Sequence, residues 1–517
     1  MHNEQNFFFN IKNHKHLGII LLTISFCIGI ATLRWQQFTD EGDNLVVGNL
    51  LVQGYTLYKD IFSHHFPFPY YWTAIIISLF GKSIFFARLS VLMFQIAVFA
   101  ITMKLSRNHL LVGTTALLWG VVRLFYRGHM VLYSSFTGVS LYAVLLITLS
   151  ILQQNISPDW RHWLTIGILS TISFLSDPLS VYAIIVSIIF LFIKKPIYGL
   201  AVSVVTIGGI TLYAGQLFIT DSLHAFLNNA VLFNSQIYAK YNYTNPVRIH
   251  ELYNIIIQGL EIANSVWWNF IPLKPIPSGY TELDQWIFTG FLYRFSLIIC
   301  VVSLVLRKQL HAASFLYLFT AAALVINKWD FRSQPFIIAA LTAISAIVIN
   351  EWQWETVNQS LKLLQKGIRL IVTVMVFWLI LQLGAYIYLN WHNRSYTAGF
   401  ASFEKEAASL QELTCHRSDV LLAYYPEGNY WYWFADLKPV SKYVFMWPWV
   451  AEVGLNDVIS ELDRQEFVIV VLKDANVWGL YDTKEYLSPL YEFLEANYHK
   501  VKEGIYISPK LFTSCPN

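Results

Sequence analysis

The chain has 517 residues, of which 56% are hydrophobic and 13% charged, against roughly 25% charged residues in typical soluble proteins. This composition excludes a soluble globular protein and indicates an integral membrane protein. The formal net charge of +3 is too small for a nucleic-acid-binding surface, and the sequence contains no zinc-ligand spacing or phosphate-binding glycine loop.

About eleven apolar segments approach the length that crosses a bilayer. In chain order they cover residues 17–33, 84–103, 109–122, 131–152, 162–176, 178–193, 197–219, 286–306, 309–326, 334–350 and 368–390. The aromatic segment 68–80 is too short to span comfortably, so we expect a juxtamembrane helix lying on the membrane surface. Asp177-Pro178 leaves open whether 162–176 and 178–193 are two spans or one kinked unit.

Cationic residues recur in the short loops after every second span, which the positive-inside rule assigns to the cytoplasm. They are Lys12/Lys15, Lys104/Arg107, Arg161, Lys194/Lys195, Arg307/Lys308 and Lys362/Lys366/Arg369. The sequence therefore predicts a multi-pass protein of the cell membrane with a cytoplasmic N-terminus and an extracytoplasmic C-terminal region. The acidic first outer loop 34–67, the loop 220–285 and the tail 391–517 then share the outer face. We interpret the first apolar segment as an uncleaved span, because no small-residue cleavage site follows it.

The tail changes character and predicts a small domain, 391–517, beside the membrane part, 1–390. Short apolar runs at 420–425, 442–445, 467–472 and 504–508 indicate strands, and 429–436, 455–465 and 485–497 indicate helices. Alternating strands and helices predict an α/β domain with a mostly parallel sheet. The aromatic runs 430–434 and 446–449 fit a carbohydrate platform or packing against the membrane surface, and we prefer the second interpretation.

The four cysteines fall into two pairs. Cys27 and Cys300 lie in apolar segments, where we expect inert packing residues. Cys415 and Cys515 lie at the two ends of the tail, and the sequence leaves open a disulfide or two unpaired thiols.

An acidic cluster, Asp40, Glu41 and Asp43, directly follows the first span. Apolar spacing predicts a helix from Glu41 to Gln53 that Gly54 ends. One interpretation is structural: Asp40 caps the helix, and Asp43 completes a capping box. Capping needs one or two acids, however, and a carboxylate at a membrane surface can accept the proton of an attacking hydroxyl.

Cationic and imidazole side chains follow in the same loop, at Lys59, His64 and His65. The prolines of the run 66–69 fix an extended turn after the histidines. Two adjacent histidines should point apart, and their spacing matches no compact zinc motif. They are either a solvated pair or donors to a leaving phosphate, which needs charge neutralisation.

Other charges are predicted in short outer loops. Arg123 and Arg127 follow the third span and are candidates for acceptor contacts or for structural anchors. Asp177 is a candidate cap for the segment that begins at Pro178. Arg332 precedes the tenth span.

Three of these features together resemble a known family: the pair Asp40-Glu41, the HH-x-P-x-P-Y-Y run at 64–71, and the Arg-x-x-Pro-Phe run at 332–336. The membrane part, 1–390, is similar to membrane glycosyltransferases of the GT-C type. Closest is the polyprenyl-phosphate-sugar-dependent group that contains the protein O-mannosyltransferases and the aminoarabinose transferase of lipid A. The general plan of many spans, a long first outer loop and a soluble C-terminal outer domain is also similar.

The resemblance implies an inverting transfer of a sugar from a polyprenyl-phosphate donor on the outer face of the membrane. By position, Asp40 resembles the catalytic base and Glu41 its partner, while His65 and Arg332, with Lys59 and His64, resemble ligands of the donor phosphate. Asp43 is an additional acid, which we expect to be structural, and Gln334 stands where many relatives have His. Members with monophosphate donors need no cofactor and generally no metal, although the third acid leaves a divalent metal open.

Two other classes are weighed against an enzyme. A transporter or flippase of lipid-linked sugars would concentrate polar groups near the bilayer midplane and show two related halves, which this chain does not. A non-catalytic envelope-assembly subunit would tolerate loss of the carboxylates. The sequence identifies neither the sugar nor the acceptor, which could be a protein, a lipid or a glycan.

Overall fold

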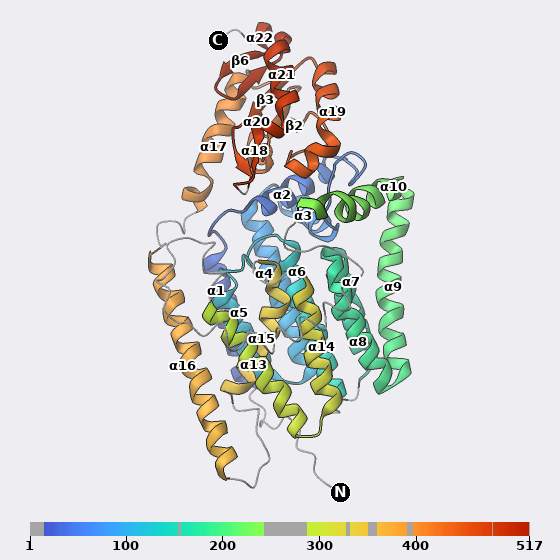
Figure 1. The fold of residues 1–517 in the computed structure, drawn as a ribbon, viewed down its shortest axis with the longest axis vertical. Helices are drawn as coiled ribbons and strands as arrows, with labels where there is room; N and C mark the ends of the chain where they lie inside the picture. Colours follow the sequence, from blue (N-terminus) through green and yellow to red (C-terminus); the bar gives the residue numbers. More distant parts are fainter. Residues whose placement is uncertain are drawn as a thin grey trace. The chain divides into compact units, whose positions relative to one another are not determined.

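The computed structural model describes residues 15–153, 156, 158–241, 287–326, 331–349, 359–389, 396–477 and 479–515. The chain divides into two compact units, each made of three chain segments (Figure 1). The helical unit comprises Met1–Arg34, Phe85–Tyr213 and Arg248–His392. The mixed unit comprises Trp35–Ile84, Ala214–Val247 and Asn393–Asn517, so it joins most of the first predicted outer loop to the tail.

The helices of the helical unit follow the predicted apolar segments closely. They are α1 Lys15–Thr32, α4 Ile84–Ser106, α5 His109–Val122, α6 Tyr133–Leu152, α7 Trp160–Ser176, η1 Pro178–Ser180, α8 Val181–Lys194, α9 Pro196–Ile219, α13 Ile287–Leu306, α14 Leu310–Ile326, η5 Phe331–Ser333, α15 Gln334–Val348 and α16 Gln359–Leu389. Among the described residues, α1, α4, α6 and α9 are long and apolar enough to cross a membrane. The chain is a membrane protein, and the number of eleven spans stays a prediction.

The core of this unit is α6, all of whose residues are buried. It packs against α7, α8, α14 and α15, which surround it with apolar side chains. The close packing of α1 on α5 depends on small residues, because a Cβ at Gly18 would lie 2.2 Å from the carbonyl oxygen of His109. Asp177 accepts a hydrogen bond from the Leu179 N–H at 3.0 Å, which confirms the predicted cap and separates α7 from α8.

The mixed unit begins with two helices, α2 Thr39–Val52 and α3 Phe68–Phe80. The bounds of α3 are those predicted, since Pro69 occupies its first turn and Gly81, with φ +77°, ends it. The second chain segment supplies α10 Leu223–Phe226, two π-helical turns, η2 Leu227–Leu232 and η3 Asn234–Tyr238, and α11 Ala239–Tyr241. Residues 242–285 of the predicted outer loop lie outside the described part of the chain.

The tail forms a five-stranded sheet with the order β2-β1-β3-β7-β6. Its strands are β1 Leu421–Tyr425, β2 Lys438–Pro439, β3 Val468–Leu472, β6 His499–Lys502 and β7 Ile505–Ile507. β1 is parallel to β2 and β3, but β7 is antiparallel to β3 and β6, so the expectation of a mostly parallel sheet is wrong. The predicted strand 442–445 is also wrong: Phe445 forms only an isolated bridge, with Glu427.

Helices cover the sheet, and a short β4–β5 hairpin, Asn476–Val477 and Tyr481–Asp482, adjoins it. The helices are α17 Tyr396–Leu413, α18 Asn429–Ala435, α19 Pro448–Arg464, α20 Thr483–Tyr486, α21 Ser488–Asn497 and α22 Pro509–Ser514. The predicted helix 485–497 is divided at Leu487, because Pro489 starts a new helix. Of the aromatic run 430–434, Tyr430, Tyr432 and Trp433 are buried within the unit.

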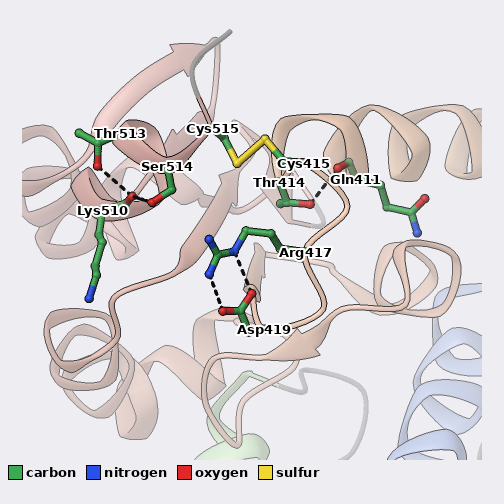
Figure 2. The surroundings of a disulfide bond; sticks show 9 residues. All are labelled: Gln411, Thr414, Cys415, Arg417, Asp419, Lys510, Thr513, Ser514 and Cys515. Carbon is green, nitrogen blue, oxygen red and sulfur yellow. Dashed lines mark hydrogen bonds and ion pairs between the residues drawn. A yellow bond between two sulfur atoms is a disulfide. The ribbon is translucent and has the colours of Figure 1, made fainter.

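Cys415 and Cys515 form a disulfide with a Cα–Cα distance of 6.0 Å, which decides between the two alternatives for these cysteines (Figure 2). The disulfide joins the end of α17 to the end of α22 across 100 residues of sequence. Cys300 is buried as expected, whereas Cys27 is exposed on α1. The expectation that Cys27 packs inside the protein is therefore wrong.

Candidate active site

The start of α2 carries the acidic cluster, with Asp40 and Glu41 in its first turn and Asp43 just beyond it. The helix begins at Thr39 after Phe38, whose φ of −154° and ψ of 135° are extended, and no side chain of the described residues caps it. The predicted capping of this helix by Asp40 and Asp43 is therefore wrong. Asp43 instead accepts a 2.7 Å hydrogen bond at Oδ2 from the hydroxyl of Tyr70 on α3.

Residues of the C-terminal region hold this turn in place. The Tyr430 hydroxyl lies 3.0 Å from the carbonyl oxygen of Phe38 and 3.1 Å from Glu41 Oε2. The Tyr430 hydroxyl also accepts a hydrogen bond from the Phe38 N–H at 3.3 Å. A side chain about 390 residues away in sequence therefore binds the backbone just before α2.

Two more side chains from the same segment contact Thr39. Asn429 Nδ2 donates to the Thr39 carbonyl oxygen at 3.0 Å, and the Thr39 hydroxyl donates to Glu427 Oε1. The approach is tight, because a Cβ at Gly42 would lie 2.8 Å from Asn429 Cβ. Glycine at this position allows the tail segment to lie directly over the helix.

The carboxyl groups of the cluster differ in burial. Glu41 is 0% exposed and Asp43 is 4% exposed, whereas Asp40 and Glu427 are half-buried. Desolvation by burial raises the pKa of Asp43 to about 7; the bond from Tyr70 opposes this shift and the charge of Asp40 adds to it. Asp43 Oδ1 is buried and makes no hydrogen bond with the described part of the chain.

Glu427 is a fourth carboxyl that the sequence interpretation missed. Burial and the charge of Asp40 raise the pKa of Glu427 to about 7. The charge of Asp40 thus raises the pKa of two acids, Asp43 and Glu427, that lie far apart in the sequence. Glu427 lies two residues after β1 ends at Tyr425, at the carboxyl end of a parallel strand. Functional groups in α/β folds commonly lie at such strand ends. The predicted strand at 420–425 was therefore a signal in the sequence that could have indicated Glu427.

The histidine loop is linked to this cluster through Ser63, whose hydroxyl accepts from the His65 N–H at 3.1 Å and lies 2.7 Å from the Tyr70 hydroxyl that donates to Asp43. His64 is buried against the rings of Phe233, Tyr238 and Phe445. The His64 and His65 rings have centroids 4.1 Å apart, so the expectation that they point apart is wrong. Lys59 is exposed and forms a 3.1 Å ion pair with Asp221.

The remaining candidates belong to the helical unit. Arg123 is 1% exposed and donates to the carbonyl oxygen of Gly29, to Thr32 Oγ1 and to Gln95 Oε1 at 2.8–3.2 Å. These bonds connect α1, α4 and α5 and indicate a structural role. Arg127 is half-buried, with a left-handed φ of 55° in the turn after α5.

Arg332 lies in η5, half-buried, with its guanidinium carbon 5.9 Å from the centre of the Tyr133 ring. Gln334, at the start of α15, donates to the carbonyl oxygen of Tyr126 and to Ser134 Oγ at 2.9 and 3.0 Å. Within the described residues, no three His, Cys, Asp or Glu side chains lie close enough together to hold a metal ion.

Comparison with solved structures identifies the fold. The chain is similar to ArnT, the aminoarabinose transferase, from Cupriavidus metallidurans bound to undecaprenyl phosphate, with a TM-score of 0.53, 11% identity and coverage of 96% of this chain and 98% of that one. The apo form of the same protein gives 0.50 and 10%, covering 95% and 97%. An Archaeoglobus fulgidus oligosaccharyltransferase tethered to an acceptor peptide with the NVT sequon gives 0.50 and 10%, covering 95% of this chain and 74% of that one.

Both neighbours are GT-C glycosyltransferases, so the chain has the GT-C fold, in agreement with the resemblance of its motifs. No protein-family model and no curated protein matches the sequence. Identities of 10–11% establish the fold alone, and the chemistry of this chain rests on its own residues.

Proposed function

We propose that this protein is an integral-membrane glycosyltransferase that moves a sugar from a polyprenyl-phosphate donor to an acceptor hydroxyl. The observation that carries the proposal is the gathering of four carboxyls, Asp40, Glu41, Asp43 and Glu427, around the first turn of α2. Burial of carboxyls beside one another is costly for folding, and such arrangements are retained where they perform chemistry.

Asp40 is the base in this proposal. The acceptor oxygen forms a bond to the anomeric carbon on the face opposite the phosphate, the bond from that carbon to the phosphate oxygen breaks, and the hydroxyl proton moves to Asp40. The configuration at the anomeric carbon is thereby inverted. An ordinary aspartate, with a pKa of about 4, is a weak base for an alcohol, so it accepts the proton late, when bond formation has made that proton acidic.

Glu41 and Asp43 support this role from the protein interior. Glu41 Oε2 is held by the Tyr430 hydroxyl, and Asp43 is held by Tyr70, so both carboxyls flank Asp40 in fixed positions. The raised pKa of Asp43 lets it carry a proton near neutral pH, and Asp40 is the more accessible of the two carboxyls.

The donor follows from the fold and from the cations of the chain. The similar ArnT structure is bound to undecaprenyl phosphate, which supports a lipid phosphate as the leaving group here. Within the mixed unit we assign His65, Lys59 and His64 to that phosphate, whose negative charge they would neutralise as it leaves. The phosphate contact of Arg332 stays a prediction from its motif. The disulfide between Cys415 and Cys515 supports an oxidising compartment, and hence transfer on the outer face.

The test uses the purified full chain in liposomes and undecaprenyl phosphate that carries radiolabelled glucose, mannose or aminoarabinose. Asp40→Asn should lower the rate of sugar release about 10²- to 10⁴-fold, the range of a general base, with unchanged thermal stability. The matched control is Asp463→Asn, an exposed acid of α19. Unaltered release in Asp40→Asn would remove the assignment, and label that crosses the bilayer without release from the lipid would indicate a flippase.

A further inference from the structure

One segment of the C-terminal region contacts both sides of Asp40. Glu427 meets the hydroxyl of Thr39, the residue before Asp40, and Tyr430 meets the carboxylate of Glu41, the residue after it. Asn429 adds a bond to the Thr39 carbonyl oxygen. All of these contacts lie within the mixed unit.

The start of α2 depends on these contacts because it lacks a cap of its own. The first N–H groups of a helix have no partner within the helix, and uncapped ends fray. Phe38 precedes the helix without a capping side chain, and the tail groups bond to it and to Thr39. These contacts, together with the packing of α2 on α3, hold the first turn and with it Asp40.

A second observation points to a ligand at this turn. Two buried acceptor atoms, Asp43 Oδ1 and Asn429 Oδ1, make no hydrogen bond with any described residue. Their side chains are 4% and 2% exposed. Unpaired buried acceptors are rare in folded proteins, and here they lie on the two elements that the tail contacts join, where a substrate rich in hydroxyl donors would satisfy them.

We propose that Glu427 is a positioning residue for Asp40, which acts through the hydroxyl of Thr39, and that the tail thereby completes the acidic site. The inference rests on the proposed function. Glu427 is not the base; it keeps the turn that carries the base in the reactive geometry. Misplacement of a reacting group by about 1 Å can cost about 10²-fold in rate. Loss of Glu427 should therefore lower kcat with little change in the KM for the lipid donor, whose phosphate it does not contact in this scheme.

The experiment compares side chains that keep the contact with side chains that remove it. Glu427→Gln keeps an oxygen that accepts from Thr39, and Thr39→Ser keeps the hydroxyl, so both should stay within about threefold of the wild-type kcat. Glu427→Ala and Thr39→Val remove the contact and should each lower kcat about 10- to 100-fold. The double variant Glu427→Ala/Thr39→Val should lose no more than the worse single variant, because both remove one interaction. Glu466→Gln, an exposed acid of the tail that pairs with Lys510, is the matched control.

The readout is sugar release from the same radiolabelled undecaprenyl-phosphate donors, with kcat and KM measured separately. Rescue by Gln and Ser, together with non-additive losses in Ala and Val at an unchanged melting temperature, supports the positioning role, because partial unfolding would lower the melting temperature along with the apparent kcat. Additive losses, or wild-type kcat in Glu427→Ala, overturn it. If Asp40→Asn abolishes release while Glu427→Ala does not, this inference fails alone; if Asp40→Asn has no effect, the proposed function fails.

Discussion

The two units bury charged groups in opposite ways. In the helical unit, the guanidinium of Arg123 lies among neutral oxygens of Gly29, Thr32 and Gln95, each within hydrogen-bond distance. In the mixed unit, the carboxyl of Asp43 lies near the like charge of Asp40, with one oxygen bonded to Tyr70 and the other without a hydrogen bond to the described residues.

Under the proposed function, this difference separates a structural charge, Arg123, from an acid that supports the chemistry, Asp43. Removal of a buried cation leaves the acceptors around it unsatisfied, which destabilises the fold. A buried acid beside another acid destabilises the fold, and it persists where the cost serves chemistry. The groups that surround Arg123 and Asp43 therefore distinguish the roles proposed for these two buried charges.

The largest expected effect on stability comes from Arg123. Arg123→Leu should lower the free energy of unfolding by about 3 kcal/mol, because three buried oxygens lose their donor. Thermal melting of the detergent-solubilised chain measures this. Arg127→Leu, at a half-buried position in the same turn, is the control and should change stability little. If Arg123→Leu melts like the wild type but is inactive, the structural assignment of Arg123 is wrong.

Next in size is the disulfide. Cys415→Ser with Cys515→Ser should cost about 2–4 kcal/mol in the tail, because the unfolded chain gains the freedom of a loop that the disulfide closes across 100 residues. Limited proteolysis with and without a reducing agent follows this change in the wild-type chain. The helical unit should keep its protection, and Cys27→Ser, at a position outside the tail, serves as the control.

The pH dependence of stability sharpens the comparison further. The pKa of Asp43 in the folded chain, about 7, lies above its value of about 4 in the unfolded chain. The contribution of Asp43 to the free energy of unfolding is therefore fully present below about pH 4 and is lost as the pH rises to about 7. Glu427 adds to the same trend. Asp43→Asn should therefore flatten the fall in melting temperature between pH 4.5 and 8, and its largest relative stabilisation should appear above about pH 7. An unchanged slope would contradict the assignment.

The smallest effect is expected at Lys59. Its ion pair with Asp221 is exposed on both sides, so Lys59→Ala should change stability by less than about 1 kcal/mol. In the proposed function Lys59 neutralises the phosphate as it leaves, so Lys59→Ala should also lower kcat a fewfold, with a smaller change in the KM for undecaprenyl-phosphate sugar. Lys510→Ala, which removes another exposed ion pair, should leave both parameters unchanged.

Local sequence predicted most of the helical architecture. The length of the apolar segments predicted the helices of the helical unit, and proline and glycine predicted the bounds of α3. These signals act within a few residues and can therefore be recognised in the sequence. The sheet was predicted less well: β1, β3 and β7 were found, but β2 and β6 were missed, and the antiparallel direction of β7 depends on pairing that strand composition does not encode. An extended run such as 442–445 does not become a strand without a partner.

The sequence predicted the acids of the site but not their surroundings. Asp40, Glu41 and Asp43 are adjacent in sequence and visible there, but their environments depend on Tyr70, Tyr430 and Glu427. Local rules therefore allowed, as one of two interpretations, a capping box that the folded chain does not form. Burial, rather than sequence spacing, determines which acid is accessible and which holds its proton near neutral pH.

The contact between Thr39 and Glu427 spans 388 residues, which has a consequence for biosynthesis. A ribosome completes α1 through α16 before it reaches Glu427, so the acids of α2 leave the ribosome long before the segment that fixes them. Contacts of such long sequence separation form slowly. Under the proposed function, a nascent chain would therefore stay inactive until its tail has folded.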